Sequence, residues 1–389
     1  MPRSTRPLST LAAAAIVVAV LSGCASTGSA EAPSSGAGLS IGAIDLSGAC
    51  PATVVIQTDW NPQAEQGGLF TLLGPDATID AGKKSVSGPL VAKGEWTGVD
   101  VEIRAGGPAI GFSGVPAQMY TDPDILLGWV NTDDAIAASD TLPTTAVMST
   151  FEKAPWAIMW DPETYPDVHS IADLGKTDAT VRYFDGTTYM DYLTGSGLVR
   201  QDQLDGSYDG TPAAFVAAEG KAAQQGFATV EPWVYENAIP EWGRPLDYQL
   251  VADTGYPIYA VALAVRSADV DAKADCLAKL VPVIQQASVD YFADPTSAND
   301  VIVSAVEQYD NGWVYPAAEA ANSTAQQRAL GLAANGVDGT FGSFDEARIA
   351  QVQSIVTPIL VGKGVTVPTG LTPEELATNR FLDPSIALP

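Results

Sequence analysis

The sequence predicts an α/β fold built as two lobes, and three observations support this prediction. A β-branched run at 54–56 is typical of a buried parallel strand, and it ends at a polar turn. Strand-like and helix-like stretches then alternate through two successive segments before the chain returns to a last β-rich strand at 258–265. The stretches after that strand are typical of helices. We therefore expect a discontinuous first lobe at 50–150 and 255–389, the latter with the C-terminal helices, and a second lobe at 151–254.

The first 23 residues are typical of an export signal. Arg3 and Arg6 precede an apolar run at 8–21, which is shorter than the roughly 20 residues needed to span a membrane. The run ends in Leu-Ser-Gly-Cys, the pattern of a bacterial lipoprotein cleavage site, so we expect Cys24 to be lipidated and residues 24–49 to form a flexible tether. This N-terminus predicts an extracytoplasmic protein held at the outer face of the cell membrane by its lipid. An ordinary secretory signal that happens to end at a cysteine is the alternative.

The composition argues against several classes of function. The formal charge is −27 at pH 7 and no basic cluster occurs, so we expect no nucleic-acid partner. His169 is the only histidine, which excludes an HExxH zinc site, and its loop-like surroundings are typical of a surface residue. Neither a Walker sequence nor a dinucleotide-binding glycine loop is present. We expect no catalytic residue, metal or cofactor, and a monomeric protein.

The turn after the first strand is the strongest candidate for a ligand-binding element. It contains Asp59, Trp60 and Asn61, and we expect Asn61 to cap a helix that has Pro62 in its first turn. Glycines 67–68 inside that helix predict that another segment approaches its backbone closely. Because open α/β sheets bind ligands at the carboxyl ends of their strands, this turn predicts one wall of a cleft. The alternative is that Trp60 only plugs the sheet end while Asp59 caps a turn.

Other strand ends supply the remaining candidate residues. In the first lobe these are the turns after strand-like runs at 99–104 and 125–130, and in the second lobe the turns after 179–184 and 226–230. For each residue the alternative is that it only caps or packs. The candidate ligand-binding residues are Asp59, Trp60, Asn61, Gly106, Trp129, Asn131, Gly186, Thr187, Thr188, Tyr189, Glu231, Trp233 and Tyr256.

The string DWNPQAEQGGLF at 59–70 resembles the opening motif of a family of periplasmic solute-binding proteins for thiamine pyrimidine precursors, nitrate, sulfonates and taurine. Weaker similarities follow in the family's order at 101–108, 124–139, 170–193 and 260–270. The resemblance implies a periplasmic-binding-protein type II fold with two crossovers and a ligand cleft between the lobes. It also implies an ABC importer, with a small-molecule ligand and permease and ATPase partners. Eukaryotic enzymes of the family build the pyrimidine from a histidine in this motif, where this chain has Gln66, which argues against that synthesis.

The side chains expected at the cleft favour a planar heteroaromatic ligand, because flat rings are combined with a few hydrogen-bonding groups. A sulfonate or nitrate site would instead concentrate basic side chains, and only Arg104, Lys153 and Arg182 are expected nearby. We therefore expect a thiamine pyrimidine precursor or a flavin-like molecule. A binding protein for sulfonate, taurine or nitrate is one alternative, and a secreted pyrimidine-transforming enzyme is another.

A cysteine pair and a long connecting segment give two further predictions. Cys50 and Cys276 are both expected in the first lobe of an extracytoplasmic protein, so a disulfide between them is possible, and two free thiols are the alternative. The segment at 76–97 is longer than a usual helix-to-strand connection and predicts a surface hairpin.

Overall fold

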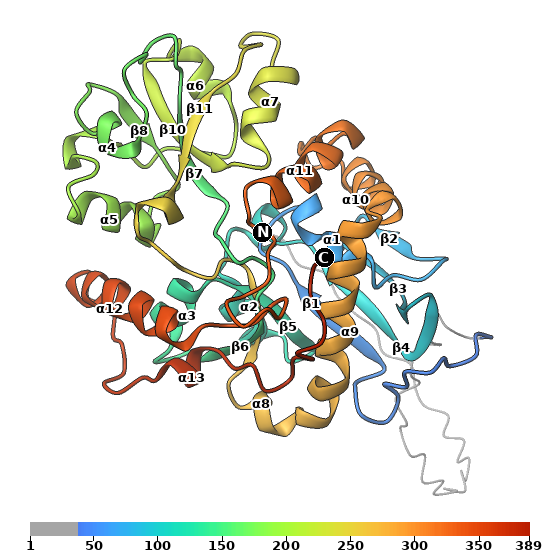
Figure 1. Cartoon of the computed structure of the whole chain (residues 1–389). Helices are drawn as coiled ribbons and strands as arrows, with labels where there is room; N and C mark the ends of the chain where they lie inside the picture. Colours follow the sequence, from blue (N-terminus) through green and yellow to red (C-terminus); the bar gives the residue numbers. More distant parts are fainter. Residues whose placement is uncertain (1–37) are drawn as a thin grey trace, which may run out of the picture. The chain divides into compact units, whose positions relative to one another are not determined.

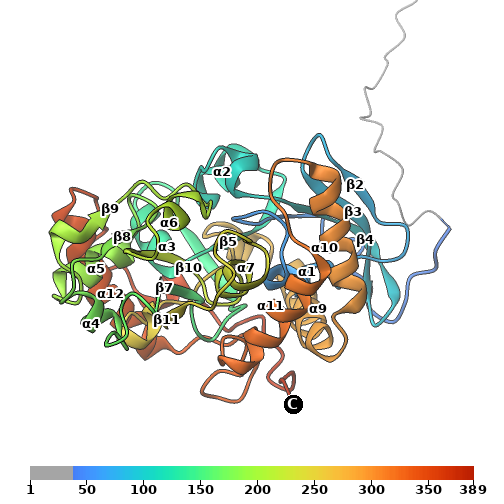
Figure 2. The same cartoon turned by 90° about the horizontal axis from the view of Figure 1, so that it is seen from above.

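The computed structural model describes residues 38–389. The predicted signal at 1–23, the lipidation site Cys24 and most of the tether lie outside the described residues. The described chain contains two β-sheets with helices packed around them (Figure 1). Figure 2 shows α10 beside β2 and β3, at the edge of the first sheet.

The first sheet is mixed, and its centre is parallel. Strand β1 pairs in parallel with β4 on one side and β5 on the other, whereas β12 is antiparallel to both β5 and β6. All six residues of β5 are buried, as expected for a strand covered on both faces. The sheet order is β2-β3-β4-β1-β5-β12-β6, with strands β1 (Thr53–Gln57), β2 (Thr78–Asp80), β3 (Ser85–Ala92), β4 (Glu95–Arg104), β5 (Ile125–Val130), β6 (Thr144–Met148) and β12 (Ala262–Arg266).

The segment at 76–97 forms a hairpin, as predicted. Strand β3 pairs antiparallel with both β2 and β4. The hairpin therefore extends the first sheet at one edge and does not stand apart from the fold.

The second sheet is smaller and lies between β6 and β12 in the sequence. Its order is β11-β7-β10-β8-β9, with strands β7 (Trp156–Trp160), β8 (Thr180–Arg182), β9 (Leu204–Asp205), β10 (Ala222–Phe227) and β11 (Asp247–Leu250). The chain thus passes from the first sheet to the second after β6 and returns before β12. These two crossovers define two lobes, and the lobe boundaries at 150/151 and 254/255 stay predictions.

The helices that accompany these strands are mostly short in the first two-thirds of the chain and longer after β12. They are α1 (Gly67–Phe70), α2 (Val115–Thr121), α3 (Thr132–Ala138), α4 (Ile171–Leu174), α5 (Thr188–Gly195), α6 (Ala213–Ala217), α7 (Glu231–Asn237), α8 (Asp269–Ala272), α9 (Ala274–Ala293), α10 (Thr296–Tyr309), α11 (Ala317–Ala329), α12 (Glu346–Gly362) and α13 (Pro373–Leu376).

Helix α1 packs directly against α9, which explains its two glycines. A β-carbon on Gly67 would lie 2.1 Å from the ring of Tyr291, and one on Gly68 would lie 2.4 Å from the hydroxyl oxygen of Ser288. Any larger residue would force the two helices apart. The close approach predicted from the glycine pair is therefore confirmed.

The helix start predicted at Asn61 is wrong. After β1 the chain runs through an irregular turn and a 3-10 helix at Ala64–Gln66 before α1 begins. The side chain of Asn61 does not cap a helix, because its Oδ1 accepts a hydrogen bond of 2.8 Å from Nδ2 of Asn311, 250 residues away. A tertiary contact thus replaces the local cap.

One arginine of α12 joins both crossovers. Arg348 donates to the carboxylate of Glu152 at 2.8 Å in the first crossover, and to the carbonyl oxygens of Pro257 at 2.7 Å and Ile258 at 2.9 Å in the second. Its guanidinium also lies 3.7 Å from the ring centroid of Tyr259. The two connections between the lobes therefore share one anchor in the first lobe.

Candidate ligand-binding site

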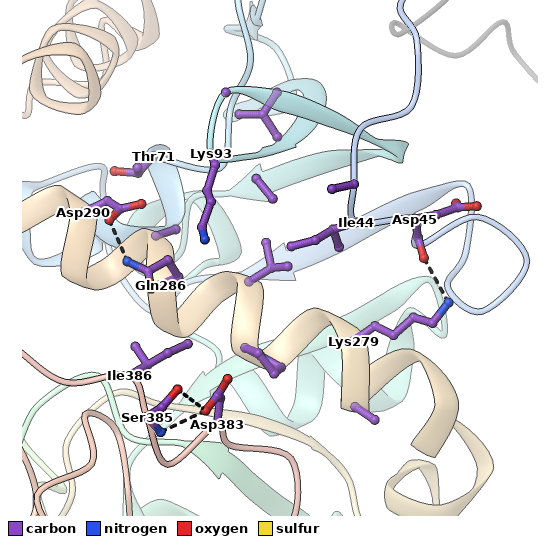
Figure 3. A pocket seen from close by; sticks show the side chains of 18 residues that line it. Ile44, Asp45, Thr71, Lys93, Lys279, Gln286, Asp290, Asp383, Ser385 and Ile386 are labelled. Atoms are coloured by element: carbon purple, nitrogen blue, oxygen red, sulfur yellow. Dashed lines mark hydrogen bonds between the residues drawn. The ribbon is translucent and has the colours of Figure 1, made fainter.

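Several hollows lie on the described part of the molecule, with volumes of up to about 700 Å³, and two of them differ sharply in their lining. The larger, of about 700 Å³, lies beside α9 and the turn of the β3–β4 hairpin (Figure 3). Its lining has no aromatic side chain, and its polar groups are largely paired with each other, as in the 2.7 Å hydrogen bond from Gln286 to Asp290. The smaller cavity, of about 190 Å³, lies between the two lobes. The smaller one is the candidate site because its lining is aromatic and carries two partly buried carboxyls.

The interlobe cavity has walls from both lobes. The turn after β1 and the segment between α10 and α11 form one side, and residues of β7, β10 and the turns after β8 and β10 form the other. Seven of the lining residues are aromatic, which makes ring faces the main contact surface for any ligand. The lining consists of Asp59, Trp60, Gln63, Trp156, Phe184, Thr187, Tyr189, Tyr208, Gly210, Gln225, Gly226, Phe227, Val230, Glu231 and Trp313.

Trp60 is the aromatic centre of the first-lobe wall. Its ring lies 6.1 Å from that of Trp313, edge-on, and 6.0 Å from that of Phe184 in the second lobe. The backbone of Gly107 approaches it so closely that a β-carbon there would lie 2.6 Å from the indole. These contacts fix the indole at the cavity.

A glutamine organises the second-lobe wall. Oε1 of Gln225 accepts hydrogen bonds from the hydroxyl of Tyr189 at 2.7 Å and from the backbone N–H of Phe184 at 2.6 Å. With its oxygen used in this way, Gln225 keeps its NH₂ group as a donor for a ligand. The Tyr189 ring packs at 5.3 Å on that of Trp156.

The cavity holds two carboxyls whose pKa values are raised. Burial, together with repulsion from Asp134 and Glu65, raises the pKa of Asp59 to about 7. Burial likewise raises the pKa of Glu231 to about 7, although its Oε2 accepts a 2.7 Å hydrogen bond from the backbone N–H of Phe227. Both groups therefore exchange protons near neutral pH.

Two further carboxyls lie behind the lining. Glu65 and Glu319 are 6% and 1% exposed, and burial raises the pKa of both, that of Glu319 to about 8. One oxygen of each, Oε2 of Glu65 and Oε1 of Glu319, is buried without a hydrogen-bond partner in the described residues. The other oxygen of Glu65 accepts from the hydroxyls of Thr229 and Ser323. The site is thus surrounded by acidic groups.

No lysine, arginine or histidine is among the lining residues. The three basic residues expected near the cleft are paired with carboxylates elsewhere: Arg104 with Glu102 and Asp122 at 2.9 and 2.7 Å, Lys153 with Asp253 at 2.9 Å, and Arg182 with Asp205 at 3.1 Å. The local balance of charge in the cavity is therefore negative.

Of the residues predicted from the sequence, Asp59, Trp60, Thr187, Tyr189 and Glu231 line the cavity together. They come from three separate segments, which meet because the ends of β1, β8 and β10 face the same space between the lobes.

Four predicted residues instead hold the first lobe together. Trp129 is 2% exposed, because β5 is covered on both faces and its side chain lies in the core. Asn131 accepts a 2.8 Å hydrogen bond from the backbone N–H of Val261, and Asn61 is held by its contact with a distant asparagine. Gly106 lies where a β-carbon would be 2.3 Å from the carbonyl oxygen of Thr58. These residues support the turns without lining the cavity.

The other predicted residues lie beside the cavity or in the second crossover. Gly186 is in a turn with φ of 87°, and Thr188 begins α5. Trp233 is two positions after Glu231 on α7, and at about 100° per residue it faces away from that side chain. The hydroxyl of Tyr256 donates to Asp133 at 2.7 Å. None of the four is in the lining.

Sequence reasoning missed ten lining residues, among them the aromatic Trp156, Phe184 and Trp313. Trp156 is the first residue of β7 and Phe184 follows β8. Their positions at strand ends could therefore have predicted that they line the cavity. Trp313 follows an Asn-Gly turn after α10, and nothing local connects that turn with the cavity. The others are Gln63, Tyr208, Gly210, Gln225, Gly226, Phe227 and Val230.

Solved structures identify the fold. The aliphatic sulphonate binding protein SsuA of Escherichia coli matches with a TM-score of 0.55 and 13% identity, over 86% of this chain and 94% of that one. SsuA of Xanthomonas axonopodis pv. citri, bound to MOPS, matches with a TM-score of 0.51 and 13% identity, over 84% and 98%. A protein of Bordetella bronchiseptica RB50 matches with a TM-score of 0.51 and 15% identity, over 85% and 96%.

The class that these similarities define is the periplasmic-binding-protein fold, with two sheets and two lobes, as the sequence predicted. No protein-family model matches the chain, and no curated protein matches it in sequence. From residue 38 onwards, none of the helices combines the length and the apolar character that a membrane span requires.

Proposed function

We propose that this protein is the extracytoplasmic solute-binding component of an ABC importer and that it captures a small heteroaromatic molecule between its lobes. The observation that carries the proposal is the interlobe cavity with seven aromatic side chains. The fold supports it, because the binding proteins with similar structures share this two-lobed architecture. Permease and ATPase subunits are the partners implied, and closure of the lobes around ligand is the mechanism.

The cavity favours a single ring. Ligand sites for drug-sized molecules have volumes of roughly 300–1,000 Å³, whereas this cavity has about 190 Å³. A pyrimidine fits that volume better than a tricyclic flavin. The NH₂ group of Gln225 and the carboxyl groups of Asp59 and Glu231 provide hydrogen bonds in the plane of such a ring, while Trp60 provides a face for stacking.

A sulfonate or nitrate is a poorer match. Two of the similar structures are described as sulfonate-binding proteins, but anion recognition needs cationic or several amide donors. This cavity has no basic lining residue and two carboxyls.

A calorimetric screen of the purified protein tests the proposal. The panel contains thiamine pyrimidines, riboflavin, taurine, alkanesulfonates and nitrate, and native mass spectrometry of protein from its own host identifies any co-purified molecule. We expect a single-ring heteroaromatic to bind. Tight binding of a sulfonate or nitrate, with no heat from any heteroaromatic, would contradict the proposal that the cavity binds a heteroaromatic molecule.

Membrane attachment is a separate part of the proposal and rests on the sequence alone. The lipid on Cys24 would hold the protein beside its permease at the outer face of the membrane. Cys24→Ser should release the protein into the medium. A variant that stays on the membrane would place the anchor elsewhere.

An enzyme that transforms pyrimidines is the second candidate, and one observation favours it. Asp59 and Glu231 have pKa values of about 7, which is the range needed for general acid–base catalysis. A turnover assay separates the two functions: ligand recovered unchanged supports binding and transport, and product formation supports an enzyme.

A further inference from the structure

Resting on the proposed function, we infer that the molecule captured in the interlobe cavity is a small organic cation, a heteroaromatic ring with a protonated or alkylated nitrogen. Its positive nitrogen is held between aromatic faces and the carboxylates of Asp59 and Glu231.

Aromatic side chains on both walls of the cavity favour a cation. Trp60, Trp313 and Phe184 form a connected group with ring centroids 6.0–6.1 Å apart, and Phe184 continues to Tyr208 at 4.8 Å. The faces of such rings carry negative electrostatic potential and attract cations, most strongly when the cation is removed from water. Rings from both lobes take part, so closure surrounds the ligand with these faces.

Carboxyls on both walls of the cavity also favour a cation. Asp59 comes from the first lobe and Glu231 from the second, and no basic side chain in the lining balances either of them. Behind them, Glu65 and Glu319 each bury one oxygen that has no partner among the described residues. A buried carboxylate without a counter-charge is unfavourable, so ligand-free protein must keep these groups partly protonated. A cation that enters provides the missing counter-charge.

Because carboxyls lie on both walls, closure of the lobes also depends on the charge of the ligand. Without ligand, an ionised Glu231 in the second lobe is repelled by Glu65 in the first lobe, and this repulsion favours separation of the lobes. A cation between them is attracted to both walls at once. An anion would add to the repulsion, and a neutral ring would leave it unchanged.

A matched pair of probes that differ only in charge tests the inference. 1-Methylnicotinamide is a cation and 3-methylbenzamide is its neutral carbon isostere. By calorimetry at pH 8, we expect the cation to bind ten-fold or more tightly than its neutral partner. Equal or tighter binding of the neutral member would overturn the charge inference and leave the proposed function in place.

Variants of the cavity residues test which side chains distinguish the cation from its neutral analogue. In Asp59→Asn and Glu231→Gln, which keep side-chain shape, the ratio of cation to neutral affinity should fall several-fold. Trp60→Ala should weaken binding of both members of the pair. Asp122→Asn, an exposed carboxylate paired with Arg104 outside the cavity, is the matched control and should leave the ratio unchanged. An unchanged ratio in both cavity variants would overturn the inference, and failure of every probe and every heteroaromatic to bind would count against the proposed function itself.

Discussion

Arg348 and Glu152 form an ion pair of 2.8 Å between helix α12 and the first crossover, and the same guanidinium binds the carbonyl oxygens of Pro257 and Ile258 in the second crossover. The pair is mostly shielded from solvent, with side-chain exposures of 15% and 24%. One planar group thus fixes the starting points of both connections between the lobes, and closure must bend the chain on the second-lobe side of this anchor.

Arg348→Lys should destabilise the protein, because an ammonium cannot bind three acceptors with the fixed geometry of a guanidinium. We expect the free energy of unfolding to fall by about 1–3 kcal/mol, from the loss of charge-assisted hydrogen bonds. Urea unfolding measures this. Arg380→Lys, at an exposed pair with Asp271, is the matched control and should change stability little. A loss no larger than that of the control would show that the crossovers are anchored by other contacts.

Trp60→Ala should weaken ligand binding by about 1–3 kcal/mol through lost stacking. Calorimetry with the ligand found in the screen provides the measurement. The control is Trp129→Phe, which alters a core tryptophan and should lower stability while affinity is kept. The role given to Trp60 would be wrong if its variant bound as tightly as the parent.

Thr229→Val should shift the protein towards an open form. The hydroxyl of Thr229, between β10 and α7, donates to Oε1 of Glu65 beside α1, so this hydrogen bond joins the two lobes. Its removal should weaken ligand affinity by about 1 kcal/mol, roughly five-fold. X-ray scattering should show a larger radius of gyration without ligand.

Ser323→Ala is the control for this prediction. Ser323 on α11 donates to the same oxygen at 2.8 Å, but α11 packs on the 3-10 helix that carries Glu65 and follows β12 in the chain. Equal opening in the two variants would mean that Glu65 is a structural residue and does not join the lobes.

Stability should fall as pH rises from about 5 to 8. Burial raises the pKa values of Asp59, Asp133 and Glu231 to about 7 and that of Glu319 to about 8. Between their ordinary values near 4 and these raised values, the folded protein holds more protons than the unfolded chain, so each step up in pH favours unfolding. Neighbouring Glu65 and Asp134, whose pKa values are also raised, act in the same direction.

Urea unfolding at pH 5, 6, 7 and 8 tests this dependence. Glu231→Gln combined with Glu319→Gln should flatten the curve and stabilise the protein at pH 8. Asp161→Asn is the control, because Asp161 is buried but paired with Arg244 at 2.9 Å and its pKa is lowered. A free energy of unfolding that rises from pH 5 to 8 would contradict the raised pKa values of these carboxyls in the folded protein.

Cys50 and Cys276 should be oxidised in the exported protein. The structure joins them, with their α-carbons 4.7 Å apart, and so links the segment before β1 to α9 across 226 residues. Thiol titration of unfolded, unreduced Cys24→Ser protein should find no free thiol, and Cys50→Ser with Cys276→Ser should lower stability by about 2–5 kcal/mol. Two free thiols would show that the pair is reduced.

The sequence by itself determined the local features of this protein. The strand at 125–130 was predicted with its observed bounds, because its apolar run has the length of a buried strand. Thr372 caps α13 through a capping box with Glu375, since both partners lie within one turn. The glycine pair in α1 correctly predicted that another segment packs closely against this helix.

Only the tertiary structure decided which side chains meet in the cavity. Trp60 and Trp129 have the same chemistry and both belong to strand ends, yet one lines the cavity and the other is in the core, because Trp129 lies within the fully buried strand β5 whereas Trp60 lies in the turn beyond β1. Trp313 reaches the cavity only because α10 ends beside the turn after β1. Burial also sets the pKa values of Asp59 and Glu231, and burial depends on how the two lobes pack, a property no local pattern contains.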